Sequence, residues 1–218
     1  MNEGSQIADF ALPLIYSAGV TIVVSLGALI VALTIGMSFA TLRFMVPNRF
    51  LQWAIQAYIE IFRNIPSLTH LFILFYGLAY LGVRLSSISA AIVGLGLIGA
   101  ASLSEVFRAG LESVHRGQRE AALAAGLRPF QAFRFIVLPQ ALRVALPPLG
   151  NYAVQLIKDT SLVAAIAAPE IMFTARNLVV NTFQTALVYT MAAALYVILC
   201  LPLSRIIRAL ETRVAAPQ

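Results

Sequence analysis

Long apolar runs separated by short polar segments dominate this chain. Five runs are long enough, at about 20 residues each, to cross roughly 30 Å of hydrocarbon as helices. They cover approximately residues 14–40, 65–81, 88–107, 146–168 and 185–203, and a possible helical lead-in from residue 51 precedes the second. Lipid offers no hydrogen bonds to an open backbone, so each run is expected to be helical. The pattern predicts an all-α fold, a polytopic membrane bundle of five transmembrane helices that forms a single domain over residues 1–218.

Composition supports this assignment. Hydrophobic residues make up 60% of the 218 residues and charged residues 11%, against about 45–50% and 25% in average soluble domains. An ordinary soluble enzyme or a disordered chain is therefore excluded. The net charge of +6 could suggest nucleic acid as a partner. The arginines lie mostly between apolar runs, however, which is the pattern that membrane orientation imposes. We therefore expect membrane lipid, and no nucleic acid, around this chain.

The arginines also predict the orientation of the chain. Arginine follows the first, third and fifth runs at positions 43, 49, 108, 116, 119, 128, 134, 143, 205, 208 and 213. The opposite side holds Arg84 and Arg176. Loops rich in Lys and Arg remain in the cytoplasm. The N-terminus is therefore expected outside and the C-terminus in the cytoplasm.

The cytoplasmic segment after the third run, at about residues 109–143, is too long for a plain connection. Residues 118–125 are strong helix formers, and Gly126 suits the left-handed position just past a helix end. Pro129 suits the first turn of a second helix. Phe130, Phe133 and Val137 would share one face of that helix, which Leu138-Pro139 is expected to end. Two short helices that meet at a glycine turn would form a docking surface for a soluble partner.

This segment resembles a signature of the binding-protein-dependent ABC permeases. That signature reads E-A-A, three residues, G, nine residues, I-x-L-P. Its fixed positions are matched here by Glu120, Ala121, Ala122, Gly126, Ile136, Leu138 and Pro139. Residues 60–66, 105–110 and 158–162 are similar to motifs of the polar-amino-acid subgroup, so the resemblance extends over about residues 15–210.

The resemblance implies a type I ABC importer fold with cytoplasmic coupling helices and a division of labour among several proteins. A cytoplasmic ATPase dimer would bind ATP and Mg and dock on Glu120, Ala121, Ala122, Gly126, Leu138 and Pro139, so no cofactor is expected on this chain. An extracytoplasmic binding protein would deliver the amino acid. A second permease chain, identical or homologous, would complete the path. Members of the family lie in the inner membrane of bacteria or archaea.

The chain itself is not expected to be an enzyme. Its single lysine, Lys158, is not part of a phosphate-binding loop of the G-x4-G-K-[ST] type. Lys158 and Ser161 match a Ser/Lys protease pair only by their spacing. His70 and His115 lie far apart in the expected topology, so no metal site is predicted.

Candidates for the solute path are ionisable and polar groups within the apolar runs, which are costly in lipid. Tyr152, Gln155 and Asp159 share one helix face and could hold an ammonium group. Lys158 points about 100° away from that face. It could bind the solute's carboxylate, or it could pair with an acid within the bundle.

Two further places have alternative explanations. Glu105 could face a cavity, or it could simply pair with Arg108 near the helix end. Asn64 and Ser67 flank Pro66 and could mark a broken helix that exposes polar groups to a ligand, or a bend at the membrane entrance. Glu60 and Arg63 would pair with each other or with headgroups. On the outer face, a loop over residues 169–184, which contains Glu170, could contact a delivery protein.

Two other functions predict different features from those of an ABC importer permease. A secondary transporter or channel subunit for small polar solutes would show inverted repeats and ion-coordinating acids. No convincing repeat is found in the sequence, and a docking segment has no role there. A membrane scaffold would not need Lys158 and Asp159 within an apolar run.

Overall fold

The structure is a computed structural model that describes residues 3–214, with the side chains of residues 7–212. Residues 1–2 and 215–218, which belong to the expected domain and its two ends, and the side chain of Arg213 lie outside the described part. The described elements are α1 (Glu3–Met45), α2 (Arg49–Asn64), α3 (Ser67–Phe72), η1 (Ile73–Gly77), α4 (Leu78–Tyr80), α5 (Ser87–Ser113), α6 (Arg116–Ala124), α7 (Pro129–Ala132), η2 (Phe133–Val137), α8 (Leu138–Asp159), η3 (Thr160–Ile166), α9 (Ile171–Thr182) and α10 (Thr185–Val214). Within residues 3–214 every one of these elements is helical, as the sequence predicts.

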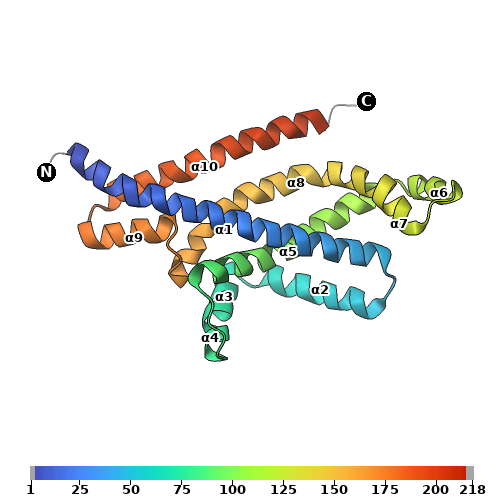
Figure 1. Ribbon diagram of the computed structural model, residues 1–218, viewed down its shortest axis with the longest axis horizontal. Coiled ribbons are helices and arrows are strands. Elements are labelled where there is room, and N and C mark those ends of the chain that lie inside the picture. The colour runs from blue at the N-terminus through green and yellow to red at the C-terminus, as the bar shows by residue number, and fades with distance from the viewer. Residues whose placement is uncertain (1–2, 215–218) are drawn as a thin grey trace.

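The long helices α1, α5, α8 and α10 run along the long axis of the molecule (Figure 1). The helix α5 is the most buried of them and packs against α1 and α8. Its small residues allow this close approach: a Cβ added at Gly96 would lie 2.7 Å from Val31 of α1, and one at Gly110 would lie 2.7 Å from the Ala141 carbonyl of α8. Close packing at small residues is a common basis of helix association in lipid.

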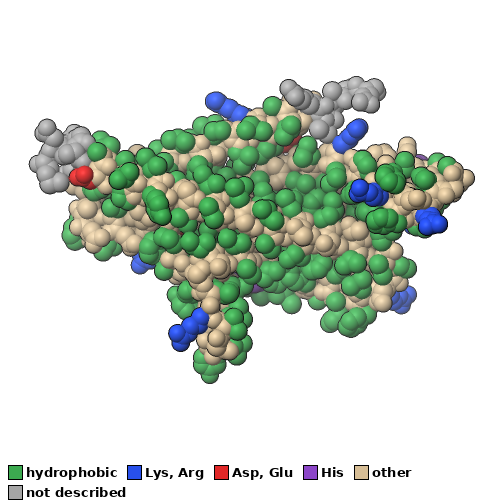
Figure 2. Space-filling view, viewed as in Figure 1, with side chains coloured by type: hydrophobic (Ala, Val, Ile, Leu, Met, Phe, Trp, Pro, Cys, Tyr) green, Lys and Arg blue, Asp and Glu red, His purple; other side chains and the backbone are tan. Residues whose placement is uncertain are grey.

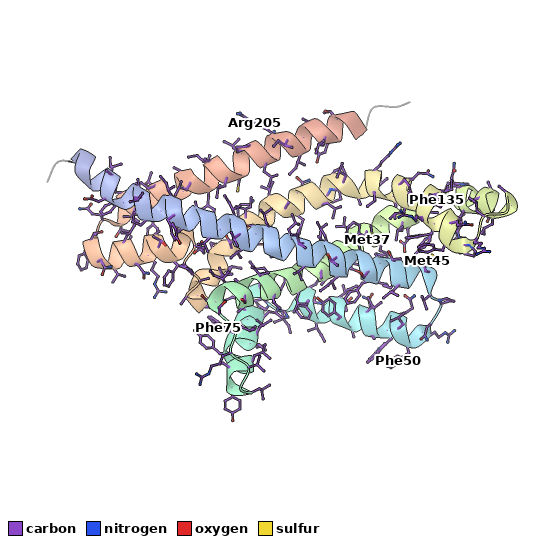
Figure 3. The ribbon with its side chains drawn as sticks, viewed as in Figure 1. Met37, Met45, Phe50, Phe75, Phe135 and Arg205 are labelled. Carbon is purple, nitrogen blue, oxygen red and sulfur yellow. The ribbon has the colours of Figure 1, made fainter. Side chains whose placement is uncertain are left out.

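Four continuous helical segments are long and apolar enough to cross a membrane: Ile7–Met45, Ser87–Ser113, Pro129–Ile166 and Thr185–Thr212. On the face shown in Figure 2, hydrophobic side chains are spread along these helices, whereas several arginine side chains lie at the end that holds α6 and α7. In Figure 3, Phe50 at the start of α2 and Arg205 in the second half of α10 both point away from the bundle. An apolar exterior with basic groups near its end is what lipid contact requires.

The crossing expected over residues 65–81 is divided differently from the prediction. The lead-in is a full helix, α2, and Asn48 caps it by accepting hydrogen bonds from the amides of Phe50 and Leu51. The chain then breaks at Ile65, which has extended backbone, and Pro66. The apolar helix that follows, Ser67–Tyr80, is shorter than the four long ones and projects sideways from the bundle (Figure 1). Because proline lacks an N–H and disfavours helix at the preceding residue, the break falls there.

The prediction that Leu138-Pro139 ends a short helix is wrong. The chain stays helical from Pro129 to Ile166, and a π-helical turn, η2, immediately precedes Leu138. Pro139 lies two residues after this π-helical turn, and the widened turn accommodates a proline within the longer helix. The side chain of Gln140 donates to the Ile136 carbonyl over 2.8 Å and so satisfies one acceptor of the widened turn.

The segment before α10 is also not a loop, because residues 171–182 form α9. Glu170 caps this helix and is fully buried. Its carboxylate accepts hydrogen bonds from the Phe173 amide at 2.7 Å and from the Tyr196 hydroxyl at 2.8 Å. Burial raises the pKa of the Glu170 carboxyl. Glu170 therefore joins α9 to α10 and is not part of an exposed contact surface.

Candidate docking turn and membrane cavity

The turn between α6 and α7 is built from backbone geometry that glycine permits. Gly126 has a φ of +87°, a conformation that costs other residues roughly 1–2 kcal/mol. Its amide donates to the Leu123 carbonyl at 3.0 Å, and the Leu127 amide donates to the Ala122 carbonyl at 3.1 Å. These two bonds form the Schellman motif that ends many helices. The sequence prediction of a glycine turn between two helices is confirmed.

The face that this turn presents combines exposed and anchored residues. Glu120 and Ala121 are exposed, whereas Ala122 is buried against the body of the protein. On the far side of the turn, the Gln131 side chain accepts a hydrogen bond of 2.9 Å from the Arg128 amide and so caps α7. The turn is thus held at both of its helix ends.

The base of the turn packs against the end of α1. Phe133 and Val137 are buried, and the rings of Phe133 and Phe44 lie 5.8 Å apart. Phe130, expected on the same face, is instead exposed. Arg119 lies over the Phe44 ring at 5.5 Å. A cavity of about 740 Å³ separates the end of α1 from α6.

Leu138 and Pro139 belong to α8 and not to the turn itself. Leu138 is half-buried and Pro139 is exposed. Because α7, η2 and α8 form one continuous helical segment, a displacement of the turn would be carried into the bundle.

A second feature is a cavity of about 590 Å³ at the break between α2 and α3. Its walls come from α2, the break, α3, α5 and α8. It is lined by Phe62, Arg63, Asn64, Ile65, Pro66, Ser67, Ile98, Ser102, Tyr152, Gln155 and Asp159. Five residues predicted for the solute path therefore border one space. They form two groups about ninety positions apart in the sequence: Asn64 and Ser67, and Tyr152, Gln155 and Asp159.

The helix α8 supplies three polar groups to this cavity, as its spacing predicts. Gln155 donates a hydrogen bond of 2.8 Å to a carboxylate oxygen of Asp159. Tyr152 lies beside Gly99 of α5 so closely that an added Cβ would collide with the phenol oxygen. The glycine therefore sets the position of the Tyr152 ring.

Asn64 and Ser67 line the cavity from its opposite side. The Asn64 amide donates to the Glu60 carbonyl at 2.8 Å and to the Glu60 carboxylate at 2.9 Å. Lys158 does not line this cavity and its side chain is exposed. The structure thus brings Asp159 to the cavity without its sequence neighbour.

Glu105 belongs to an ion-pair network and also borders a smaller cavity. One of its oxygens accepts from Arg43 of α1 at 2.9 Å and the other from Arg108 at 2.7 Å. Arg108 pairs in turn with Glu112 at 2.6 Å. The smaller cavity, about 390 Å³, is lined by Arg63, Ser102, Glu105, Val106, Ala109, Gly110, Val144 and Pro148. Both explanations for Glu105, cavity lining and pairing, therefore describe parts of its surroundings.

Arg63 and Ser102 border both membrane cavities, yet neither was selected from the sequence. The spacing of Glu60 and Arg63 suggested an ion pair. In the structure the Glu60 carboxylate accepts from Gln56 at 2.6 Å and from Asn64. The proline three residues after Arg63 is the signal that could have identified this end of α2.

Comparisons with known proteins agree with this architecture. The chain is 37% identical over 182 residues to a probable amino-acid ABC transporter permease of Bacillus subtilis, YckA, covering 84% of this chain and 80% of the relative. It is 37% identical over 193 residues to a probable glutamine ABC transporter permease of the same organism, GlnM, covering 88% and 89%. The glutamine transport system permease GlnP of Escherichia coli is 35% identical over 158 residues, 72% of each chain.

Solved structures show the same fold at lower identity. A crystal structure of an amino acid ABC transporter with histidines superposes with a TM-score of 0.88 at 24% identity and covers 98% of this chain and 99% of that one. The MetNI methionine ABC transporter, in an inward-facing conformation, gives a TM-score of 0.74 at 22% identity, with 96% and 99% covered.

A family model matches most of the chain. It describes the binding-protein-dependent transport system inner membrane component, and the match spans residues 32–216. That span contains the glycine turn, the ion-pair network and both membrane cavities. The resemblance carried by Glu120, Gly126 and Pro139 therefore extends to the whole bundle, and the chain belongs to the family of inner membrane components of binding-protein-dependent transport systems.

Proposed function

We propose that this chain is the transmembrane permease subunit of an ATP-driven ABC importer that translocates polar amino acids. The observation that carries this proposal is one continuous helical segment, Pro129–Ile166, that begins at the glycine turn and bears Asp159 at the membrane cavity. Relatives that share 35–37% identity are named as amino-acid or glutamine permeases. The proposal gives the chain no catalytic step of its own.

ATP hydrolysis belongs to a separate cytoplasmic ATPase dimer in this proposal, with ATP and Mg bound there. The docking surface is the exposed part of α6 around Glu120 and Ala121, with Gly126 setting the angle of the next helix. When the ATPase dimer closes on ATP, the docked turn moves as a rigid body. The attached helix then shifts the cavity between two access states.

The remaining partners follow from the family. An extracytoplasmic binding protein delivers the amino acid, and a second permease chain, identical or homologous, closes the open side of the 590 Å³ cavity. The proposed location is the inner membrane of a bacterium or archaeon, with the N-terminus outside and the α6 end in the cytoplasm. The basic groups at the α6 end (Figure 2) support that orientation.

Competition uptake tests the proposal. Cells that carry the complete importer would take up labelled arginine, with glutamate, glutamine and histidine as competitors. Uptake that needs this chain and its ATPase, and that at least one competitor reduces, is the expected result. Uptake that persists without the ATPase but collapses when the ion gradient is dissipated would favour a secondary transporter, the alternative considered from the sequence.

A further inference from the structure

Arg63 lies in the last turn of α2 and borders both cavities. It lines the cavity of about 590 Å³ together with Asp159, and the cavity of about 390 Å³ together with Glu105. Since α2 begins at Arg49, Arg63 lies roughly 21 Å along the helix axis from that end. The Arg63 side chain is exposed, so its guanidinium is accessible to a ligand that enters either cavity.

The described residues supply Arg63 with no acidic partner. The ion pairs found in this part of the chain link Arg43, Arg108, Glu105 and Glu112 with one another and do not include Arg63. The Glu60 carboxylate, one turn back on α2, already accepts from Gln56 and Asn64. Glu105, the acid of the smaller cavity, already binds two guanidinium groups.

Asp159 stands in a corresponding position on α8. Among the described residues its hydrogen bond comes from the neutral amide of Gln155, and it forms no ion pair with Lys158. One cavity therefore carries a guanidinium on α2 and a carboxylate on α8 that bind neither each other nor another charge. A ligand with one negative and one positive group would neutralise both.

We propose that Arg63 binds the α-carboxylate of the transported amino acid while Asp159 binds its α-ammonium group, an inference that rests on the proposed function. A guanidinium matches a carboxylate with two parallel hydrogen bonds, which a lysine cannot reproduce. With both charges of the zwitterion held, the solute side chain faces Asn64, Ser67 and Tyr152. The site then recognises the backbone common to all α-amino acids.

This arrangement makes a free carboxylate a requirement at the permease itself. A solute whose carboxylate has become a neutral carboxamide would leave the Arg63 guanidinium without its partner. A site built to bind a polar group of its ligand discriminates against an analogue that lacks this group. The permease would therefore reject such amides independently of the binding protein.

Equilibrium binding to the purified permease–ATPase complex tests this inference. The binding protein is left out, because its own selectivity would hide that of the permease. Labelled glutamine, arginine, histidine and glutamate are compared, and the tightest binder is then matched against its α-carboxamide. The wild type is expected to prefer the free acid by at least about tenfold. In Arg63→Gln that ratio should fall to about one. In Arg63→Lys it should take an intermediate value.

Two controls separate the possible failures. Arg49→Gln, at the other end of the same helix, should keep the wild-type ratio, and co-purified ATPase reports whether each variant is assembled. A wild-type complex that does not distinguish acid from carboxamide, or an Arg63→Gln complex that still does, overturns the role of Arg63. A wild-type complex that binds no amino acid at all overturns the proposed function instead.

Discussion

The docking turn and the membrane cavity differ in how the chain specifies them. The turn is encoded by consecutive residues, and its two backbone bonds, from Gly126 and Leu127, join residues at most five positions apart. The cavity is assembled from the end of α2 and the end of α8, about ninety positions apart, with α5 between them. The turn is therefore a local rigid unit, whereas the cavity depends on how three helices pack.

This difference has a functional consequence. A rigid unit can transmit force without changing shape, which suits a surface that docks on another protein. A space between helices can change shape when one helix tilts, which suits a site that must bind and then release. The continuous helical segment from Pro129 to Ile166 connects the two. Substitutions in each region should therefore fail in different ways.

The largest effect is expected for Gly126→Val. A β-branched residue at a φ of +87° is strongly disfavoured, and the second helix would leave the turn at another angle. Co-purification of the ATPase should fall by at least about tenfold, since each 1.4 kcal/mol corresponds to that factor. Membrane insertion should be unchanged, as measured by the amount of permease in washed membranes.

Gly126→Asn provides the matched control, because asparagine tolerates the left-handed conformation. This variant should retain most of the ATPase. Normal co-purification with Gly126→Val would mean that the turn angle is irrelevant to docking. The conclusion that the turn acts as a rigid docking unit would then be wrong.

The sequence predicted the turn well because its signals are local. Helix formers, a glycine and a proline at fixed spacing act within a few residues, and tertiary packing did not override them. The predicted stop at Pro139 was wrong because the π-helical turn that precedes it widens the helix and accommodates the proline without ending the helix.

The cavity was predicted only in part. Tyr152, Gln155 and Asp159 could be grouped because helical periodicity alone brings them to one face. That Asn64 and Ser67 lie opposite them depends on how α2 and α3 pack on α5, which periodicity does not encode. Arg63 was missed because a local ion-pair rule assigned it to Glu60, whereas the structure gives the carboxylate of Glu60 to Gln56 and Asn64.

The next effect in size is expected for Asp159→Asn. Loss of the carboxylate removes a charge-assisted contact of about 1.5–3 kcal/mol. Uptake at limiting solute should fall by about tenfold or more, while co-purified ATPase stays at the wild-type level. Lys158→Gln is the matched control one residue away, and since Lys158 does not line the cavity its uptake should change less than about twofold. Equal losses in both variants would show that the charges act through helix packing and not at the cavity.

Gly99→Ala tests the packing that shapes the cavity. The added methyl group would collide with the Tyr152 hydroxyl and lie 2.7 Å from the Cβ atom of Ala32. The expected cost is about 1 kcal/mol, at the lower end of the range for overpacked cores. It should lower the apparent melting temperature in nanodiscs and weaken solute binding. Gly19→Ala, where nothing lies within 4 Å, should leave both unchanged. A Gly99→Ala variant with normal binding would show that the position of Tyr152 does not matter to the site.

The smallest effect is expected for Glu105→Gln, which lies between the two regions. Glu105 borders the 390 Å³ cavity, and its partner Arg43 borders a separate cavity near the end of α1. The partly exposed ion pairs should contribute no more than about 1 kcal/mol. The glutamine amide keeps one acceptor oxygen, so it can still accept a hydrogen bond from one of the two arginines. Stability, ATPase docking and solute binding should therefore remain close to wild type, as in Glu112→Gln, whose carboxylate pairs only with Arg108 among the described residues. Uptake measured per ATP hydrolysed is the decisive quantity. If that ratio collapses in Glu105→Gln while docking and binding are intact, the network itself carries movement from the turn to the cavity. The continuous helix from Pro129 would then not be the sole connection between the two regions.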